Sequence, residues 1–399
     1  MSTTLITNLS EIFTADAAQS TVRDGALLMD GDRISWIGPA ADAPAAGTVL
    51  DADGRAALPG WVDSHTHLVF AGDRGDEFVA RMAGQDYAAG GIAVTTAATT
   101  TTPDDELFAL VASRAAEAVA GGTTYLETKT GYGLTVAEET RHARIAAEVV
   151  DAVTYLGAHL VPAGMDAQEY TDLVCGEMLA GVLPHVRFAD VFCERGAFDE
   201  AQSRQVLAAC AAAGLGLKVH GNQLGPGPGV RLAVEFGAQS VDHVNYLDAA
   251  DVDSLAGSWS GWDPATRSGI PGTVATCLPA CDLSTRQPLA PGRELLDAGV
   301  RIALASNCNP GTSYTTSMAF CVATAVLQMR LDIGEAITAA TYGGALALGV
   351  QDEVGSLEVG KRADLQLLDA PSVSHLAYRP GMRLTGPVFR AGALAAGAI

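Results

Sequence analysis

The chain has 399 residues, 48% of them hydrophobic, which is enough for one large packed domain or a large domain with a small companion. Its 46 acidic and 24 basic residues give a net charge of −22, which repels nucleic acid and anionic membranes and excludes both as expected partners. No apolar run is long enough to span a membrane, and the first residues lack a basic stretch followed by an apolar one. The seven cysteines form no Cys-x-x-Cys pair, so we expect reduced thiols in a soluble, cytoplasmic protein and no metal on Cys277 or Cys281.

The two ends of the chain show the pattern of a small β domain. Residues 3–58 give short strands broken by turn signals, such as Asp30-Gly31, and residues 355–399 alternate turns with strand-like runs in the same way. Neither piece alone buries a core. We therefore expect residues 1–58 and 354–399 to form one composite β-sandwich domain beside a domain of residues 59–353.

The central region alternates short β-branched or apolar runs with alanine-rich stretches of helical period, which is typical of repeated βα units. The helical stretches include 104–120, 135–149, 199–213 and 315–330. Eight strands are predicted, near 61–66, 123–128, 152–158, 188–193, 216–220, 239–243, 273–278 and 300–306. Eight such units predict an α/β fold of the (β/α)8 TIM-barrel type. A doubly wound open sheet stays an alternative, although no Gly-x-Gly-x-x-Gly follows the first strand. Segments 224–229 and 257–272 are expected to be long loops, the second a candidate lid over the barrel mouth.

Histidines at strand ends carry the strongest chemical signal. In residues 59–67 (PGWVDSHTH), His65 and His67 end an apolar run two residues apart, a spacing that directs both rings to one face of a strand. Catalytic metals need about three protein ligands and an open position. Further candidates end later strands, namely His220, His243 and Asn307. The sequence therefore predicts a metal-dependent hydrolase.

Five short motifs then resemble those of one family, the imidazolonepropionases of the metal-dependent amidohydrolase superfamily. They are FAGDR (70–74), KTGYG (129–133), LGAH (156–159), DVFCE (190–194) and NPGT (309–312). The resemblance runs from about residue 59 to 385. It implies a barrel enzyme that hydrolyses the ring amide of 4-imidazolone-5-propanoate to N-formimidoyl-L-glutamate in histidine degradation. It also implies a homodimer.

The resemblance implies a site as well. One zinc or iron ion is held by His65, His67 and His220, with the fourth ligand on strand eight, where Asn307 stands. His243, Gln223 and Asn307 are the implied catalytic residues, His243 contacting the reacting group and Gln223 lying over the ring. The implied substrate-binding residues are Arg74, Tyr132, His159, Gln223, Asn309, Gly311 and Thr312. An arginine fork suits a propionate carboxylate, and the loop at Gly311 exposes backbone amides to a second polar group.

Asn307 departs from the superfamily, which carries aspartate at this position. Asparagine offers a metal a neutral oxygen but does not act as a base at neutral pH. Three interpretations stay open: a natural variant helped by His243, a substitution that traps substrate, or a relative with other chemistry. The alternatives to the implied function are thus an amidohydrolase or deaminase acting on another heterocycle and a non-catalytic protein that binds metal and ligand.

Two further residues bear on the number of metal ions. Glu194, at the end of strand four, could bridge a second metal or equally pair with Arg195 or a loop backbone, and we expect one metal. Lys129 is expected to pair with Glu127 or to serve as a pocket cation rather than as a ligand.

Overall fold

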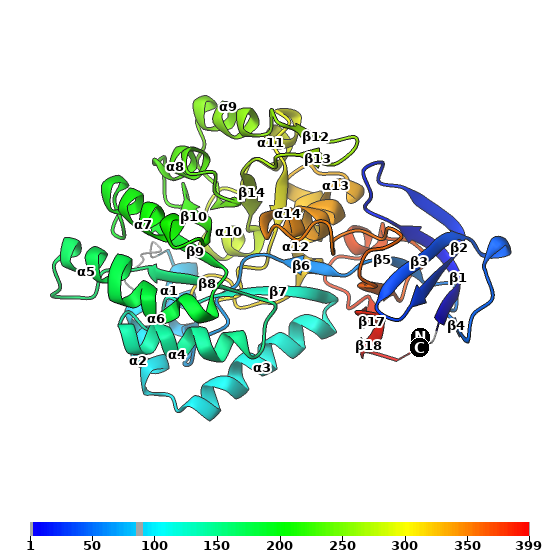
Figure 1. Ribbon diagram of the computed structural model, residues 1–399, viewed down its shortest axis with the longest axis horizontal. Coiled ribbons are helices and arrows are strands. Elements are labelled where there is room, and N and C mark those ends of the chain that lie inside the picture. Colours follow the sequence, from blue (N-terminus) through cyan, green and yellow to red (C-terminus); the bar gives the residue numbers. More distant parts are fainter. Residues whose placement is uncertain (1–2, 85–90, 399) are drawn as a thin grey trace.

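The computed structural model describes residues 3–84 and 91–398 and contains two large sheets (Figure 1). The first is a parallel sheet of eight strands in the order β15-β14-β11-β10-β9-β8-β7-β6. Its strands are β6 Trp61–Asp63, β7 Thr123–Lys129, β8 Ala152–Ala158, β9 Phe188–Cys193, β10 Gly216–Gly221, β11 Ser240–His243, β14 Val274–Cys277 and β15 Ile302–Leu304. Each of the eight strands overlaps its predicted range, although β6 and β15 end earlier than predicted, and the predicted α/β barrel is confirmed.

Backbone hydrogen bonds just beyond β6 and β15 join the two edges of this sheet. The Asn307 N–H donates to the His65 carbonyl oxygen at 2.9 Å, and the His67 N–H donates to the Cys308 carbonyl oxygen at 2.9 Å. Both residues of the histidine pair therefore lie on the seam that closes the barrel, and the open-sheet alternative is excluded.

Helices cover the outside of the barrel (Figure 1). Four of them match the predicted helical stretches: α3 Asp104–Ala120, α4 Val136–Ala147, α7 Glu200–Ala212 and α12 Met318–Gln328. The others are α1 Gly75–Met82, α2 Ile92–Thr101, α5 Ala167–Leu173, α6 Leu179–Val182, α8 Gly229–Glu235, α9 Ala249–Ser258, α10 Pro279–Thr285, α11 Gly292–Asp297, α13 Ile333–Thr338, α14 Gly344–Ala347 and α15 His375–Tyr378. None of the described helices is long and apolar enough to cross a membrane.

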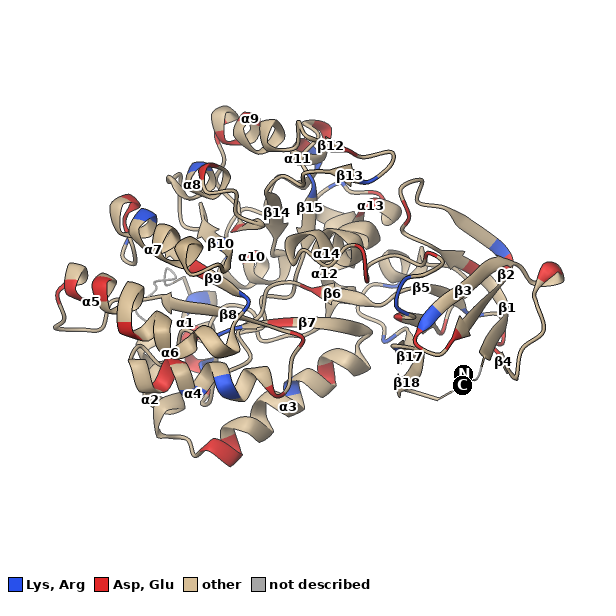
Figure 2. Ribbon diagram, in the orientation of Figure 1, with Lys and Arg blue, Asp and Glu red and all other residues tan. Residues whose placement is uncertain are grey.

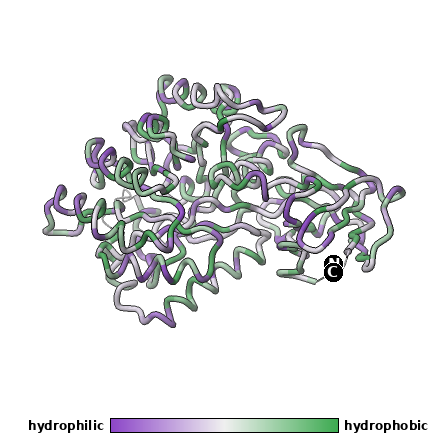
Figure 3. The backbone as a smooth tube through the Cα atoms, viewed as in Figure 1, coloured by the Kyte–Doolittle hydropathy of each residue, from purple (hydrophilic) through white to green (hydrophobic). Residues whose placement is uncertain are grey.

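The helices begin where local side chains satisfy their first N–H groups. Asp199 before α7 accepts from the Gln202 N–H while the Gln202 side chain accepts from the Asp199 N–H, a capping box. Thr135 caps α4 in a simpler way. Acidic residues, red in Figure 2, occur along the outer helices, for example α3, α5 and α9, and the outermost turn near α5 is hydrophilic (Figure 3).

The second sheet is built from both ends of the chain. Its order is β18-β17-β16-β5-β1-β2-β3, with β4 paired to β1. Its strands are β1 Thr3–Phe13, β2 Thr21–Asp30, β3 Arg33–Pro39, β4 Thr48–Asp51, β5 Ala56–Pro59, β16 Leu365–Leu368, β17 Thr385–Arg390 and β18 Ala393–Ala396. Because β16 pairs with β5, the expected union of the two ends in a separate sheet is confirmed.

The suggested lid, segment 257–272, does not lie over the barrel mouth. It contains a small hairpin of β12 Trp262–Asp263 and β13 Ser268–Gly269, between α9 and β14. A connection from a helix to the next strand ends at the strand's amino end, opposite the face where barrel enzymes keep their sites. Arg267 in this hairpin donates to the Ala15 carbonyl oxygen at 2.9 Å, so the hairpin contacts the terminal sheet instead.

Candidate metal and substrate site

Three imidazole nitrogens converge at the carboxyl end of the barrel. His67 Nε2 lies 3.3 Å from His65 Nε2 and 3.4 Å from His220 Nε2. Zinc–nitrogen bonds of about 2.0–2.1 Å at a tetrahedral angle separate ligand nitrogens by about 3.3–3.4 Å. These two separations therefore fit His67 sharing one tetrahedral metal ion with each of its neighbours, while His65 and His220 also form a close group with His243.

The protonation of these rings agrees with that fit. His65 Nδ1 lies 2.6 Å from Asp242 Oδ2, which fixes the ring proton on Nδ1 and leaves a lone pair on Nε2. Burial holds the pKa of His65 and of His67 well below the usual range, so both rings are neutral. A neutral imidazole offers a lone pair on one ring nitrogen, which is the form that ligates a metal ion.

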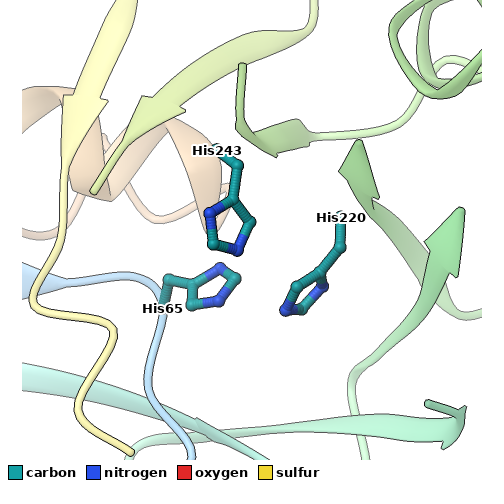
Figure 4. A group of neighbouring side chains, drawn as sticks. All are labelled: His65, His220 and His243. Carbon is teal, nitrogen blue, oxygen red and sulfur yellow. The ribbon is translucent and has the colours of Figure 1, made fainter. Parts of the chain in front are cut away.

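His243 follows the same ring of strands and faces the cluster from β11. Nitrogen atoms of His65, His220 and His243 lie within 4.8 Å of one another, and Figure 4 shows these three side chains turned toward a common centre. The backbone of His243 has a φ of 85°, a left-handed conformation that is energetically unfavourable for a non-glycine residue. Such strain persists where the surrounding structure holds it, which marks the end of β11 as a specialised position.

Asn307 also has a left-handed backbone, with a φ of 51°, and begins the loop that follows β15. Its N–H donates to His65, while its side-chain oxygen accepts a hydrogen bond from Asn309 Nδ2 at 3.2 Å. The amide is therefore oriented by the loop at the edge of the histidine cluster.

A pocket opens above these residues, and it gathers nearly every side chain that the sequence singled out. Among the described residues its lining is His67, Arg74, Ile92, Tyr132, His159, Phe192, His220, Gln223, His243, Asn307, Asn309 and Thr312. No aspartate or glutamate occurs among these lining residues. Among the described lining residues, the side chains that ordinarily exchange a proton near neutral pH are therefore imidazoles.

Two aromatic side chains form one wall of the pocket. The His159 ring stacks on His67 with centroids 5.6 Å apart, and Tyr132 lies 5.3 Å from His159. His159 Nδ1 donates to the Gly131 carbonyl oxygen at 2.8 Å, and burial lowers the pKa of His159 to about 4. His159 therefore offers an accepting Nε2 to a ligand at neutral pH.

Polar groups of Arg74 and of the loop after β15 make hydrogen bonds to other groups of the protein. The Arg74 fork meets Glu77, with Nε and Nη2 at 2.8 and 2.7 Å from its two carboxylate oxygens. A Cβ added at Gly311 would come within 2.3 Å of Arg74 Nη1, so glycine allows this close approach. Asn309 Oδ1 accepts from the Gly311 and Thr312 N–H groups at 2.9 and 2.8 Å. The loop amides predicted to meet a ligand thus bond to Asn309.

Glu194 is buried beside the pocket and fixes a loop. Its carboxylate accepts from the Gln223 N–H at 2.5 Å and from the Leu224 N–H at 3.2 Å, and burial raises the pKa of Glu194. These bonds orient Gln223, whose side chain lines the pocket.

Sequence reasoning missed a layer of buried charge beneath the histidines. Asp242 and Asp190 contact His65 and His220, and Lys129 contacts both aspartates. The signal was present, because charged residues at alternating positions of apolar strands point into a barrel.

Comparison with known proteins also relates the chain to the amidohydrolases. The amidohydrolase family profile matches residues 56–392. Proteins named imidazolonepropionase from Arthrobacter sp. (strain FB24) and Paenarthrobacter aurescens (strain TC1) are 70% and 69% identical over 397 residues; these alignments cover 98% of this chain and 98% and 97% of those proteins.

Solved structures of lower identity share the fold. A zinc-bound adenosine deaminase from Xanthomonas campestris is 19% identical with a TM-score of 0.71, covering 98% of this chain and 92% of that one. A triazine hydrolase from Arthrobacter aurescens is 18% identical with a TM-score of 0.77, covering 99% and 94%. At these identities the likeness concerns the fold alone.

Proposed function

Because the chain belongs to the imidazolonepropionases of the amidohydrolase family, we propose that it hydrolyses 4-imidazolone-5-propanoate to N-formimidoyl-L-glutamate in histidine degradation. The observation that carries the proposal is the convergence of three histidine Nε2 atoms below a pocket lined by the expected side chains. A deaminase acting on another heterocycle is not favoured, since the relatives matched over nearly the full length carry the imidazolonepropionase name.

We propose one divalent ion, zinc or iron, held by His65, His67 and His220, with the Asn307 side chain as the fourth protein ligand. Both metals accept imidazole, so the ligand set does not choose between them. When bound, the ion polarises the attacking water and the ring carbonyl. A second ion is not part of the proposal, because Glu194 is bonded to the backbone of the Gln223 loop.

The pocket residues supply the remaining chemistry. Water adds its oxygen to the ring carbonyl carbon, the ring C–N bond breaks, and the ring nitrogen takes up a proton. Since no carboxylate occurs among the described lining residues, we assign the transfer of that proton from the water to the nitrogen to the His243 imidazole. Gln223 lies over the ring and holds it through its amide.

Substrate orientation falls to the pocket wall and the loop after β15. Tyr132 and His159 contact the ring, while Arg74 receives the propionate carboxylate in exchange for its present contact with Glu77. Asn309, Gly311 and Thr312 shape the opposite side, where Asn309 preorganises the loop through its bonds to both backbone amides.

The test is a time course of N-formimidoyl-L-glutamate formation with zinc-loaded protein, comparing the chain with its Asn307→Asp variant. We expect turnover by both, because the three histidines hold the metal and an imidazole handles the proton. Turnover only after the substitution would leave the fold and pocket correct and the chain disabled. No product from either protein would refute the substrate assignment.

The cellular location, oligomeric state and partners of the enzyme are also proposed from the family. We propose a cytoplasmic homodimer that acts on a small molecule and binds neither nucleic acid nor membranes. The net charge of −22 supports the last part of this proposal.

A further inference from the structure

We infer that Lys129 is a positioning residue of the metal site, whose single buried ammonium group fixes the two carboxylates that orient His65 and His220. The inference rests on the metal site of the proposed function and extends it to residues that touch neither metal nor substrate.

Lys129 lies at the end of β7 with its side chain fully buried inside the barrel. Its Nζ lies 3.0 Å from Glu127 Oε1, 3.0 Å from Asp190 Oδ2 and 3.9 Å from Asp242 Oδ2. The three surrounding carboxylates hold the pKa of Lys129 above its usual value despite burial, so the group is charged. One cation thus joins side chains from three strands, β7, β9 and β11.

The same two aspartate oxygens reach the histidines. Asp190 Oδ2 lies 3.0 Å from His220 Nδ1, and Asp190 Oδ1 accepts from the His220 N–H at 3.1 Å. Asp242 Oδ2 lies 2.6 Å from His65 Nδ1. Each Oδ2 therefore lies between the ammonium group and one imidazole. Lys129 Nζ attracts both carboxylates, Asp190 at 3.0 Å more directly than Asp242 at 3.9 Å. A carboxylate behind a ligating histidine sets the ring orientation and keeps the proton on Nδ1, so that Nε2 faces the metal. Asp242 does this for His65 through a hydrogen bond, whereas Asp190 binds the His220 backbone N–H and lies at ion-pair distance from its ring.

The charge of this layer also suits a metal site whose pocket lining, among described residues, lacks carboxylates. Three acidic residues (Glu127, Asp190 and Asp242) and two lysines (Lys129 and Lys218) are buried there, giving a net charge of −1 by formal count. Buried charges cost free energy even when paired, so such a layer needs a reason beyond stability. Compensating a divalent cation through the imidazoles supplies that reason.

The neighbouring lysine has different contacts. Lys218 Nζ donates to the Ser64 carbonyl oxygen at 3.1 Å and to Ser240 Oγ at 3.2 Å. Among described residues, Lys129 is the lysine within ion-pair distance of the aspartates behind His65 and His220. Lys218 acts on Asp242 through its charge, but Lys129 is the lysine whose ammonium group lies within ion-pair distance of both aspartates, so we assign the positioning role to Lys129.

The experiment separates position from charge by comparing two variants of the full chain. Lys129→Met removes the ammonium group and Glu127→Gln removes one carboxylate, so the double variant keeps the formal charge of the layer. Glu127→Gln alone is the control: Glu127 contacts Lys129 and accepts from the Thr66 N–H between His65 and His67, and glutamine keeps an oxygen for that N–H while it removes the charge. Zinc affinity is measured by competition with a chromophoric chelator, the visible spectrum of the cobalt-loaded protein reports ligand geometry, and circular dichroism reports the fold.

We expect the double variant to bind zinc about 10-fold more weakly than the wild type, the lower end of the loss typical of an outer partner of a ligating histidine, because the two aspartates themselves remain. Its cobalt spectrum should change, while the control stays within about twofold of the wild type in zinc affinity. If the double variant does not fold, the variant with Lys129→Gln and Glu127→Gln replaces it in the test. Because glutamine keeps a neutral hydrogen-bond donor, the zinc affinity of this variant should lie between the affinity of the wild type and the affinity expected without a donor.

Equal zinc affinity in the wild type and the double variant would overturn the inference, as would an equal loss in the control. Absence of zinc binding by the wild type is a different result, because it would refute the proposed metal site itself.

Discussion

The barrel interior and the terminal sheet are both made of short apolar strands, yet they bury different side chains. The terminal sheet has an apolar core cluster, namely Ile6, Leu9, Ile12, Leu27, Met29, Ile34, Ala52, Ala57, Leu357, Ala363, Leu365, Leu367 and Phe389. Its buried carboxylates Glu11 and Asp364 pair with Arg23 and Arg362, whose side chains are 69% and 20% exposed. The barrel buries a charged layer and a histidine cluster at one end instead. The difference lies in how buried charge is paired: the terminal sheet pairs Glu11 and Asp364 with arginines that reach solvent, whereas the barrel encloses both partners of its ion pairs beneath the histidines.

Removing a metal ligand tests the chemical side of this comparison and has the largest expected effect. His220→Ala leaves two of the three converging nitrogens, so we expect zinc affinity and turnover to fall by more than about 100-fold, the upper end of the loss for an outer partner. Metal content after dialysis and the product time course measure the two effects. His185→Ala, in the turn before β9, is the control and should leave both unchanged. Retained zinc in the His220 variant would remove His220 from the ligand set.

Truncating a core residue of the terminal sheet should lower stability and leave turnover unchanged. Leu365 in β16 is fully buried, and its replacement by alanine should lower the free energy of unfolding by about 2–5 kcal/mol. Turnover of the folded protein should stay unchanged, because the terminal sheet contributes none of the described lining residues. Urea unfolding and steady-state assays check this, with Leu394→Ala, which is 50% exposed in β18, as the control. A large loss of turnover in the folded Leu365 variant would contradict the division of roles.

The fold was largely predictable because each barrel strand is a short apolar run between helical stretches. The main differences concern β6 and β15, which end at Asp63 and Leu304, before their predicted ends. The segments beyond them close the barrel through single hydrogen bonds at His65, His67 and Asn307. The backbone no longer has regular strand geometry at Asn307, where φ is 51°. Such seam contacts depend on distant residues, and local patterns do not encode them.

The histidines were predictable because the chain has only eight and most of the site histidines end strands. Their partners were harder to predict. Asp190 and Asp242 appear in the sequence as ordinary acidic residues, and only the barrel geometry shows that one lysine, Lys129, reaches both. The engagement of Arg74 by Glu77 was also missed, since the fork was expected to be free for a carboxylate ligand.

A buried ionisable group outside the site sharpens the comparison. His142 in α4 is fully buried, and neither ring nitrogen has a hydrogen-bond partner among the described residues. Burial lowers the pKa of His142 to about 3, below its value in the unfolded chain, so its neutral form is favoured in the folded state. As the pH falls below about 6.5, His142 therefore becomes protonated in the unfolded chain but not in the folded protein. The free energy of unfolding then decreases by about 1.4 kcal/mol for each further pH unit.

The change that tests this is His142→Gln, which keeps a polar side chain and cannot titrate. Between pH 7 and pH 5 the variant should lose about 2 kcal/mol less stability than the wild type, since one group no longer takes up a proton on unfolding. Urea unfolding at both pH values measures the difference. An unchanged pH dependence would mean that His142 is protonated in the folded protein. Turnover at pH 7 should not change.

The smallest expected effect concerns a charge pair that lies in solvent. Arg33 in β3 meets Glu353, in the segment after the barrel, at 2.8 Å, but the two side chains are 42% and 57% exposed. Exposed pairs contribute less than about 1 kcal/mol, because water already solvates both ions and salt screens their attraction. Arg33→Ala should therefore lower the free energy of unfolding by less than about 1 kcal/mol, and added salt should shrink the difference further. A loss that persists in high salt would show that this pair behaves like the buried ions around Lys129, and the distinction between the two regions would then fail.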